Sequence, residues 1–196
     1  MSITKEKLNL AGWLSITNAL FAIPSIAMSW FLDSMDGIGP IISQAILTMV
    51  SLGLFLYIIS SLRKLLNIRF EFHDVDIYIS MLIWGNVALA ALSILSLGSK
   101  ELEWVNKYLS IAAFIFFGIL SILFARRLLR LPGNLYGLLK PYCYITIGSG
   151  ICFITVFLAP LGIIVGAVTD VILGVIFFRA AEQPLSPDEL FKVPIG

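Results

Sequence analysis

The sequence predicts an all-α integral membrane protein with six transmembrane helices. Three observations predict this fold: 59% of the 196 residues are hydrophobic, only 13% are charged, and the charges fall in clusters separated by long apolar runs. A soluble domain of this size is about 45–50% apolar and about 25% charged. The composition therefore excludes a soluble enzyme, a nucleic-acid-binding domain and a disordered chain.

Each apolar run is close to the ~20 residues that a helix needs to cross a hydrocarbon core of about 30 Å. The runs are continuous rather than alternating, which favours helices over the strands of a membrane barrel. The last run is long enough for two crossings, and we expect residues 159–162, which contain a proline and a glycine, to form a turn within it. The six predicted spans are residues 9–32, 40–63, 76–97, 106–131, 141–158 and 161–181.

Prolines and one acidic residue mark several of these ends. Pro40 and Pro141 lie where a proline is tolerated in the first turn of a helix, and Asp76 suits an N-cap. A Pro–Gly pair at 132–133 follows the fourth span and ends it. Pro24 lies inside the first span and predicts a kink, because it lacks a backbone N–H.

The positive charges predict the orientation of the chain. If the N-terminus is cytoplasmic, eleven of the 13 Lys and Arg residues lie on the cytoplasmic side, and only Lys100 and Lys107 lie outside. This division follows the positive-inside rule, so we expect both termini in the cytoplasm. Residues 1–182 would form the six-helix transmembrane domain and residues 183–196 a short cytoplasmic tail. We expect the cytoplasmic membrane of a bacterium or archaeon.

An internal repeat is a further interpretation of the sequence. Gly53, Gly118 and Gly174 each precede an apolar stretch in an even-numbered span, and Asn18 and Asn86 lie at similar depth in odd-numbered spans. Three helical hairpins in the same orientation, a pseudo-threefold repeat, would explain these spacings. Chance similarity among apolar segments is the alternative.

Asp170 is the most informative candidate for a functional residue. It lies about ten residues into the sixth span, near the bilayer midplane, where an ionised carboxylate is costly. No Lys, Arg or His lies at that depth in another span, so its candidate partners are polar groups such as Asn18, Asn86 and Ser149. The group could form a proton or cation site, or it could hold helices together by a hydrogen bond.

Small residues predict close helix packing. Gly162, Gly166 and Gly174 recur with Asp170 every four residues on one face of the sixth span, and Gly118 begins a shorter stripe on the fourth. Such stripes usually let two helix backbones approach, within one chain or between protomers.

Basic clusters at the cytoplasmic ends of the spans predict contact with lipid headgroups. Their members are Arg63, Lys64, Arg126, Arg127 and Arg130. The single histidine, His73, stands beside acidic residues before the third span, a pattern more typical of helix capping than of a metal site. No catalytic motif is present, and no histidine lies in a span to activate Ser149.

We therefore expect a non-catalytic membrane scaffold, accessory subunit or stress-related module that binds partners through its helix faces. The alternative is a small transporter or channel for a small solute or cation, with a polar site around Asp170. The expected partners are membrane lipids, and other membrane subunits or further copies of the chain. We expect no nucleic-acid partner, no cofactor and no metal.

Overall fold

The computed structural model describes residues 4–35, 37–97 and 100–183. This part of the chain forms α-helices and one short 3-10 turn, and it contains no strand. Five of its helices are long and apolar enough to cross a membrane, which supports an integral membrane protein. The elements are α1 (Lys5–Asp33), α2 (Ile38–Arg69), α3 (Asp76–Ser96), α4 (Lys100–Leu128), η1 (Leu135–Gly137), α5 (Leu139–Ile154) and α6 (Ala159–Glu182).

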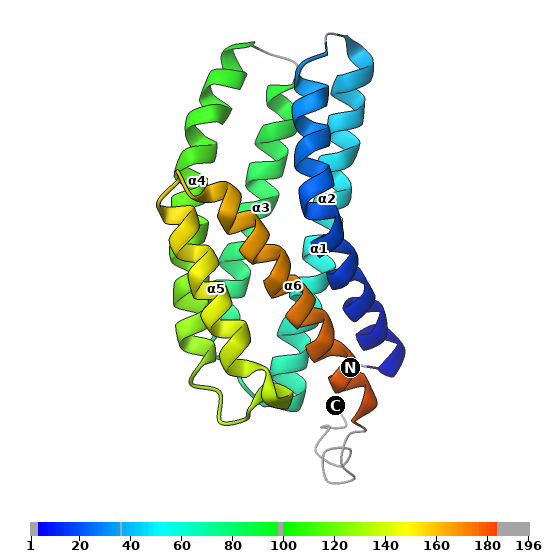
Figure 1. The fold of residues 1–196 in the computed structure, drawn as a ribbon, viewed down its shortest axis with the longest axis vertical. Helices are drawn as coiled ribbons and strands as arrows, with labels where there is room; N and C mark the ends of the chain where they lie inside the picture. The colour runs from blue at the N-terminus through cyan, green and yellow to red at the C-terminus, as the bar shows by residue number, and fades with distance from the viewer. Residues whose placement is uncertain (1–3, 36, 98–99, 184–196) are drawn as a thin grey trace, which may run out of the picture.

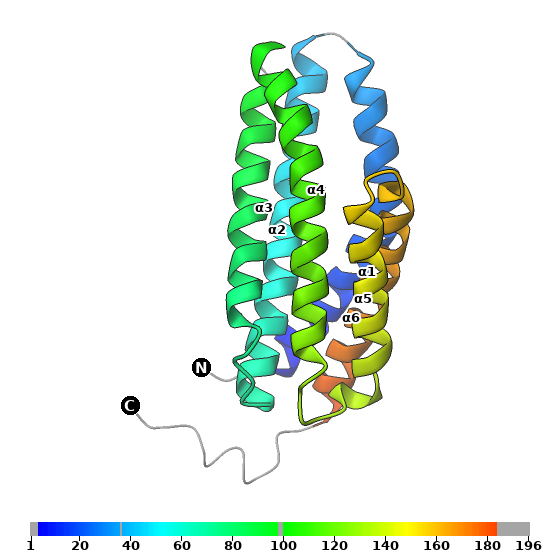
Figure 2. The ribbon, with the colours of Figure 1, turned by 90° about the vertical axis from the view of Figure 1, so that its left-hand side faces the viewer.

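The helices pack in chain order around a closed circuit. Each helix contacts the next one along the chain, and α6 returns to pack against α1 over the most extensive contact in the bundle. We call the end where α1 begins and α6 ends the basal end. The opposite end, which carries the α1–α2 and α3–α4 connections, is the distal end (Figures 1 and 2).

The α5–α6 hairpin is shorter than the two hairpins beside it. The 16 residues of α5 span about 24 Å, whereas the 29 residues of α1 span about 43 Å, at ~1.5 Å per residue. Figures 1 and 2 show the turn between α5 and α6 well below the distal ends of α1–α4. The distal part of the bundle is therefore built from four helices, and the basal part from six.

The turn expected at residues 159–162 was placed wrongly. The helix α6 already begins at Ala159, with Pro160 in its first turn. The chain reverses instead at residues 155–158, where Val156 has a left-handed backbone conformation (φ 52°). Proline lacks a backbone N–H, and the first turn of a helix needs none, so Pro160 starts a helix here rather than ending one.

The other boundaries differ because the helices continue into polar sequence beyond the apolar runs. The second helix extends to Arg69, and the fourth begins at Lys100. Pro40 and Pro141 lie in the first turns of α2 and α5, and α1 continues through Pro24. Of the predicted tail, residues 184–196 lie outside the described residues.

The assignment of Asp76 as an N-cap was also wrong. Val75 occupies the N-cap position, and no side chain caps α3. The carboxylate of Asp76 faces α2 instead, where it accepts hydrogen bonds from Arg63 Nε at 2.9 Å and from Asn67 Nδ2 at 3.0 and 3.1 Å. The residue therefore joins two helices near the basal end rather than capping one.

The hydrophobic core lies in the basal part of the bundle. Fully buried side chains meet there from α2, α4 and α6, among them Leu62, Leu128 and Phe177. Toward the distal end this packing stops, and no residue between positions 37 and 57 is buried. The bundle is thus closed by packed side chains at its basal end and loosely filled at its distal end.

Hydrogen bonds to the η1 segment hold the basal end together. Arg69 Nη1 donates to the hydroxyl oxygen of Tyr136 at 2.8 Å, and Arg179 Nη1 donates to the backbone oxygen of Tyr136 at 2.6 Å. These bonds attach one loop to α2 and to α6. Leu135, in the same segment, is fully buried in the core.

Candidate functional site

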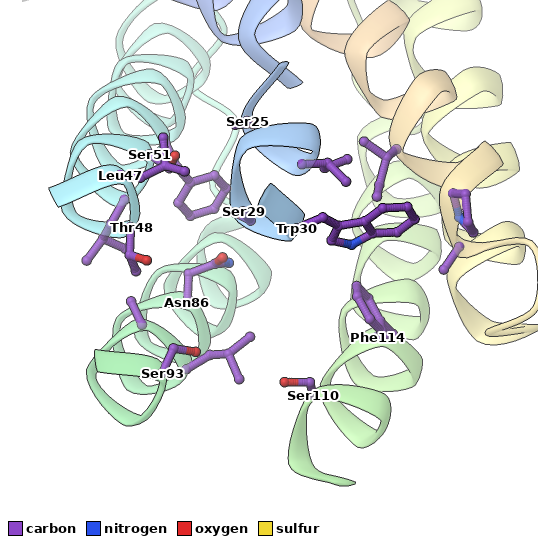
Figure 3. Close-up of a pocket in the computed structure, with 18 of the residues that line it drawn as sticks. Ser25, Ser29, Trp30, Leu47, Thr48, Ser51, Asn86, Ser93, Ser110 and Phe114 are labelled. Atoms are coloured by element: carbon purple, nitrogen blue, oxygen red, sulfur yellow. The ribbon is translucent and has the colours of Figure 1, made fainter. Parts of the chain in front are cut away.

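A cavity of about 1380 Å³ lies among the distal halves of α1, α2, α3 and α4. Its floor is made by Val156 in the α5–α6 turn and by the first residues of α6, including Pro160 and Ile164. Figure 3 shows lining side chains that come from α1, α2, α3 and α4, with the indole of Trp30 extending across the space. The cavity exists because the α5–α6 hairpin ends before the distal part of the bundle.

One continuous side of α2 and one of α3 border this cavity. On α2 and on α3 the lining residues recur at helical spacing, so each helix presents one side to the space. On α2 they include Thr48, Ser51, Leu52 and Phe55, and on α3 they are Asn86, Leu89, Ala90 and Ser93. Small side chains are frequent in this lining, which leaves the helix backbones accessible to an apolar partner.

The polar groups of the cavity are neutral. Three of them bond within their own helices: Asn86 Nδ2 donates to Leu82 O and Thr48 Oγ1 to Gln44 O, each at 2.9 Å, and Ser25 Oγ donates to Ala22 O at 3.0 Å. The hydroxyls of Ser29, Ser51 and Ser110 have no hydrogen-bond partner in the described part of the chain. They can therefore donate to, or accept from, a bound group.

Asn18 and Asp170 are brought together in a second arrangement, between α1 and α6. Asn18 Nδ2 donates to Asp170 Oδ2 at 2.7 Å, although the two residues are 152 positions apart in the sequence. Both side chains are half-buried. Neither lines the cavity: Asn18 lies about 7 Å to the basal side of Ile23, and Asp170 about 9 Å to the basal side of Ile164, at ~1.5 Å per residue.

The other two candidate binding residues make separate contacts. Asn86 bonds within α3 and lines the cavity, as described above. Ser149 Oγ donates to the backbone oxygen of Gly162 at 3.0 Å, which ties α5 to α6. The structure thus joins one predicted pair, Asn18 and Asp170, and places Asn86 and Ser149 elsewhere.

Glycine contacts set the spacing between α4 and α5. A Cβ atom added at Gly118 would lie 2.7 Å from the backbone oxygen of Gly150, and one added at Gly150 would lie 2.7 Å from the backbone oxygen of Gly118. Real Cβ atoms do not approach this closely, so the two backbones touch where the glycines face each other. Gly53, placed with Gly118 in the sequence repeat, has nothing within 4 Å of such an atom.

The glycines of α6 contact two different neighbours. A Cβ at Gly174 would lie 3.0 Å from the backbone oxygen of Gly12 on α1, and one at Gly162 would lie 3.0 Å from Cys152 Cβ on α5. At Gly166 the nearest atom would be at an ordinary distance of 3.6 Å. Small residues thus let α6 approach α1 near its basal end and α5 near its start.

The predicted headgroup residues lie at the basal ends of α2 and α4. Arg126, Arg127 and Arg130 are exposed there. Arg63 forms an ion pair with Asp76, and Lys64 lines a small second pocket between α1 and α2.

His73 Nδ1 lies 3.3 Å from Asp76 Oδ2, and the described residues include no group of three or more side chains able to hold a metal ion.

Sequence reasoning missed the distal cavity. A signal for it exists in the polar side chains at helical spacing in the distal halves of two spans, such as Thr48 with Ser51 and Asn86 with Ser93. This pattern indicates that the two polar side chains of each span lie on the same face of its helix. It does not reveal that the fifth helix ends early and leaves those faces uncovered.

No family model matches the sequence, and no curated protein or solved structure is significantly similar to it.

Proposed function

We propose that the protein is a non-catalytic membrane module that binds a transmembrane helix of a partner subunit in its distal cavity. One observation carries this proposal: the basal part of the bundle is packed, whereas the distal part leaves an open cavity of about 1380 Å³ among α1, α2, α3 and α4. A bundle of this kind is incomplete at one end.

The volume of the cavity fits a helix better than a small ligand. Small-molecule sites usually enclose about 300–1,000 Å³. A helix about 10 Å across fills roughly 1,400 Å³ over about 18 Å, which is the length of about 12 residues. The α5–α6 hairpin falls short of α1 by a similar length, because α5 has 16 residues and α1 has 29. One partner segment could therefore occupy the space above the α5–α6 turn.

The chemistry of the lining also suits a helix. Apolar side chains and small residues dominate it, and its polar groups are neutral hydroxyls, one amide and the indole N–H of Trp30. Transmembrane helices associate through small residues, close packing and hydrogen bonds from Ser, Thr and Asn. Ser51 on α2 and Ser110 on α4 are well placed to supply such bonds.

We propose that both chain ends are cytoplasmic, so that the cavity opens in the outer half of the membrane. The concentration of Arg and Lys at the basal end supports this orientation.

The six helices then form three hairpins, with the α5–α6 turn inside the hydrocarbon. Backbone groups there need internal partners. Val156 N bonds to Phe153 O at 3.1 Å and Ala159 N to Val156 O at 3.0 Å, as that depth requires.

Photo-crosslinking in native membranes tests the partner-helix proposal. A photoreactive residue at Ser51 faces the cavity, whereas one at Val50, the matched control, lies on an exposed position outside it. We expect a discrete protein adduct from Ser51 alone, and its loss when Ala90→Trp places an indole from α3 in the space that a partner helix would occupy. The same adduct from both positions, or an adduct that survives Ala90→Trp, would contradict the proposal.

The second candidate is a small transporter or channel. The observation that favours it is the Asn18–Asp170 pair, an acid at membrane depth placed between the cavity and the packed basal part. Intramembrane acids often belong to proton or cation pathways. In this case Asp170 would exchange a proton or cation that enters through the cavity.

Reconstitution into liposomes separates the two candidates. Asp170→Asn keeps an oxygen that can accept the bond from Asn18 but removes the acid. Unchanged stability with loss of a proton or solute flux seen in the parent protein would establish the transport function. The module proposal predicts no flux from either protein across a series of ions and small solutes.

A further inference from the structure

A second pocket, the basal pocket, lies between the start of α1 and the basal half of α2. It encloses about 230 Å³, and its lining residues are Lys7, Leu8, Tyr57, Ser60, Ser61 and Lys64. On α2 the residues at 57, 60, 61 and 64 share one face, because they follow helical spacing. Lys7 completes the pocket from α1. The pocket is therefore formed by the packing of two helices rather than by one flexible segment.

The functional groups of this pocket are two ammonium ions and three hydroxyls, with no acid among them. Within the described residues, the ion pairs near this end of the bundle use Arg63 and His73 with Asp76, and neither lysine takes part. Glu6 precedes Lys7 on α1, but neighbouring residues of a helix do not face the same side. Two positive charges thus border one small space without a negative group inside it.

The serine hydroxyls are also available to a ligand. Many hydroxyls in helices donate to a carbonyl of the preceding turn, as Thr48 and Thr169 do here. Ser60 and Ser61 make no such bond in the described structure, nor any other hydrogen bond. Their donors are therefore free to meet an acceptor in the pocket.

We propose that the basal pocket binds a phosphate group, carried either by an anionic phospholipid or by a soluble phosphate compound. Ammonium and hydroxyl groups together supply the charge and the hydrogen bonds that phosphate oxygens accept. The volume is about eight times the ~30 Å³ of one liquid water, enough for the five heavy atoms of a phosphate. This proposal is independent of what occupies the distal cavity.

The position of the pocket makes a phospholipid the expected source. Lys7 and Lys64 stand at the basal end, where the chain carries most of its positive charge, and Tyr57 lies about 10 Å nearer the bilayer centre, at ~1.5 Å per residue. A headgroup phosphate would meet the lysines while its acyl chains followed the groove between α1 and α2. Nonspecific attraction of surface lysines to anionic lipid is the simpler alternative.

Native mass spectrometry of the delipidated full chain in detergent tests the proposal, with phosphatidylglycerol as the lipid probe. We expect one tightly bound lipid. Lys7→Gln should weaken its binding about fivefold, because it removes one of the two positive charges that border the pocket. The matched control Lys5→Gln removes the same charge from α1 outside the pocket, and it should change the affinity by less than twofold.

A Ser60→Ala/Ser61→Ala variant separates a built site from surface attraction, because it keeps every charge. The proposal predicts at least a threefold loss of affinity, whereas nonspecific attraction predicts none. Should the double variant fail to fold, Tyr57→Phe removes one lining hydroxyl with a smaller change. Equal losses for Lys5→Gln and Lys7→Gln, with no effect of removing hydroxyls, would overturn the proposal.

A competition arm identifies the source of the phosphate. Inorganic phosphate at millimolar concentration is added to the lipid-bound protein. Displacement of phosphatidylglycerol indicates a site that also accepts soluble phosphate, and retention of the lipid indicates a headgroup site. Absence of a specific complex with either probe would refute the assignment.

Discussion

Replacing Gly118 by alanine should loosen the contact between α4 and α5. The new Cβ would lie 2.7 Å from the backbone oxygen of Gly150 and 3.1 Å from the backbone nitrogen of Ile154. Ordinary contact begins at 3.4 Å, so the helices must separate by about 0.7 Å. Backbone atoms cannot rotate away as a side chain can, and overpacking of this kind costs about 1–3 kcal/mol.

The net loss of stability in Gly118→Ala is smaller than the steric cost alone. Alanine favours a helix interior over glycine by about 0.5–1 kcal/mol, which offsets part of the overpacking. We therefore expect Gly118→Ala to lower the free energy of unfolding by about 0.5–2 kcal/mol. Gly150→Ala should have a similar effect. The double variant should cost less than the sum of the two, because both changes force the same separation.

Equilibrium unfolding in mixed micelles with increasing dodecyl sulfate measures these free energies by circular dichroism. Gly148→Ala is the matched control, since it lies on α5 two residues from Gly150 with nothing within 4 Å of its added Cβ. It should be neutral or slightly stabilising. The reasoning is refuted if Gly118→Ala unfolds with the parent protein, or if Gly148→Ala is destabilised as much.

Three further predictions use the same unfolding assay. Asp170→Leu leaves the amide of Asn18 without its acceptor and should lower the free energy of unfolding by about 0.6–2 kcal/mol. Asp170→Asn keeps an acceptor and should stay within about 0.5 kcal/mol of the parent protein. Equal losses for the two variants would show that the bond contributes nothing to stability. Leu62→Ala in the basal core should lower the free energy of unfolding by about 2–5 kcal/mol, whereas Leu47→Ala at the cavity wall should lower it by less than about 1 kcal/mol. A larger loss for Leu47→Ala than for Leu62→Ala would contradict the difference in packing between the two ends. Arg63→Gln breaks a partly exposed ion pair, so it should cost less than about 1 kcal/mol, and a larger, salt-independent loss would contradict the assignment.

The sequence located the helices well but their ends less well. Hydropathy senses the part of a helix that lies in hydrocarbon, so the third span was predicted at 76–97 and found as Asp76–Ser96. At Arg69 and Lys100 the helices continue through charged residues, which a search for apolar runs cannot include. The α5–α6 turn was misplaced because Pro160 is equally compatible with the end of one helix and the start of the next.

Contacts between distant helices required the three-dimensional structure. The sequence named Asn18 as one of several candidate partners of Asp170, but it does not single Asn18 out, because it does not state that α1 and α6 are neighbours. The cavity depends on the relative lengths of the hairpins and on which faces they leave uncovered. For the same reason the pairing of Gly118 with Gly150 was not foreseen, although Gly118 was identified as a packing residue.

Chemical labelling of single cysteines tests most directly whether the bundle is packed at one end and open at the other. Cys143 and Cys152 are first replaced by alanine, and Ser51→Cys and Leu62→Cys are then compared on α2 in purified, reconstituted protein. We expect Ser51→Cys to react with a water-soluble maleimide or with a membrane-permeant one, and Leu62→Cys to react with neither until the protein is denatured. Labelling of Leu62→Cys in the folded protein, or protection of Ser51→Cys from both reagents, would contradict the account.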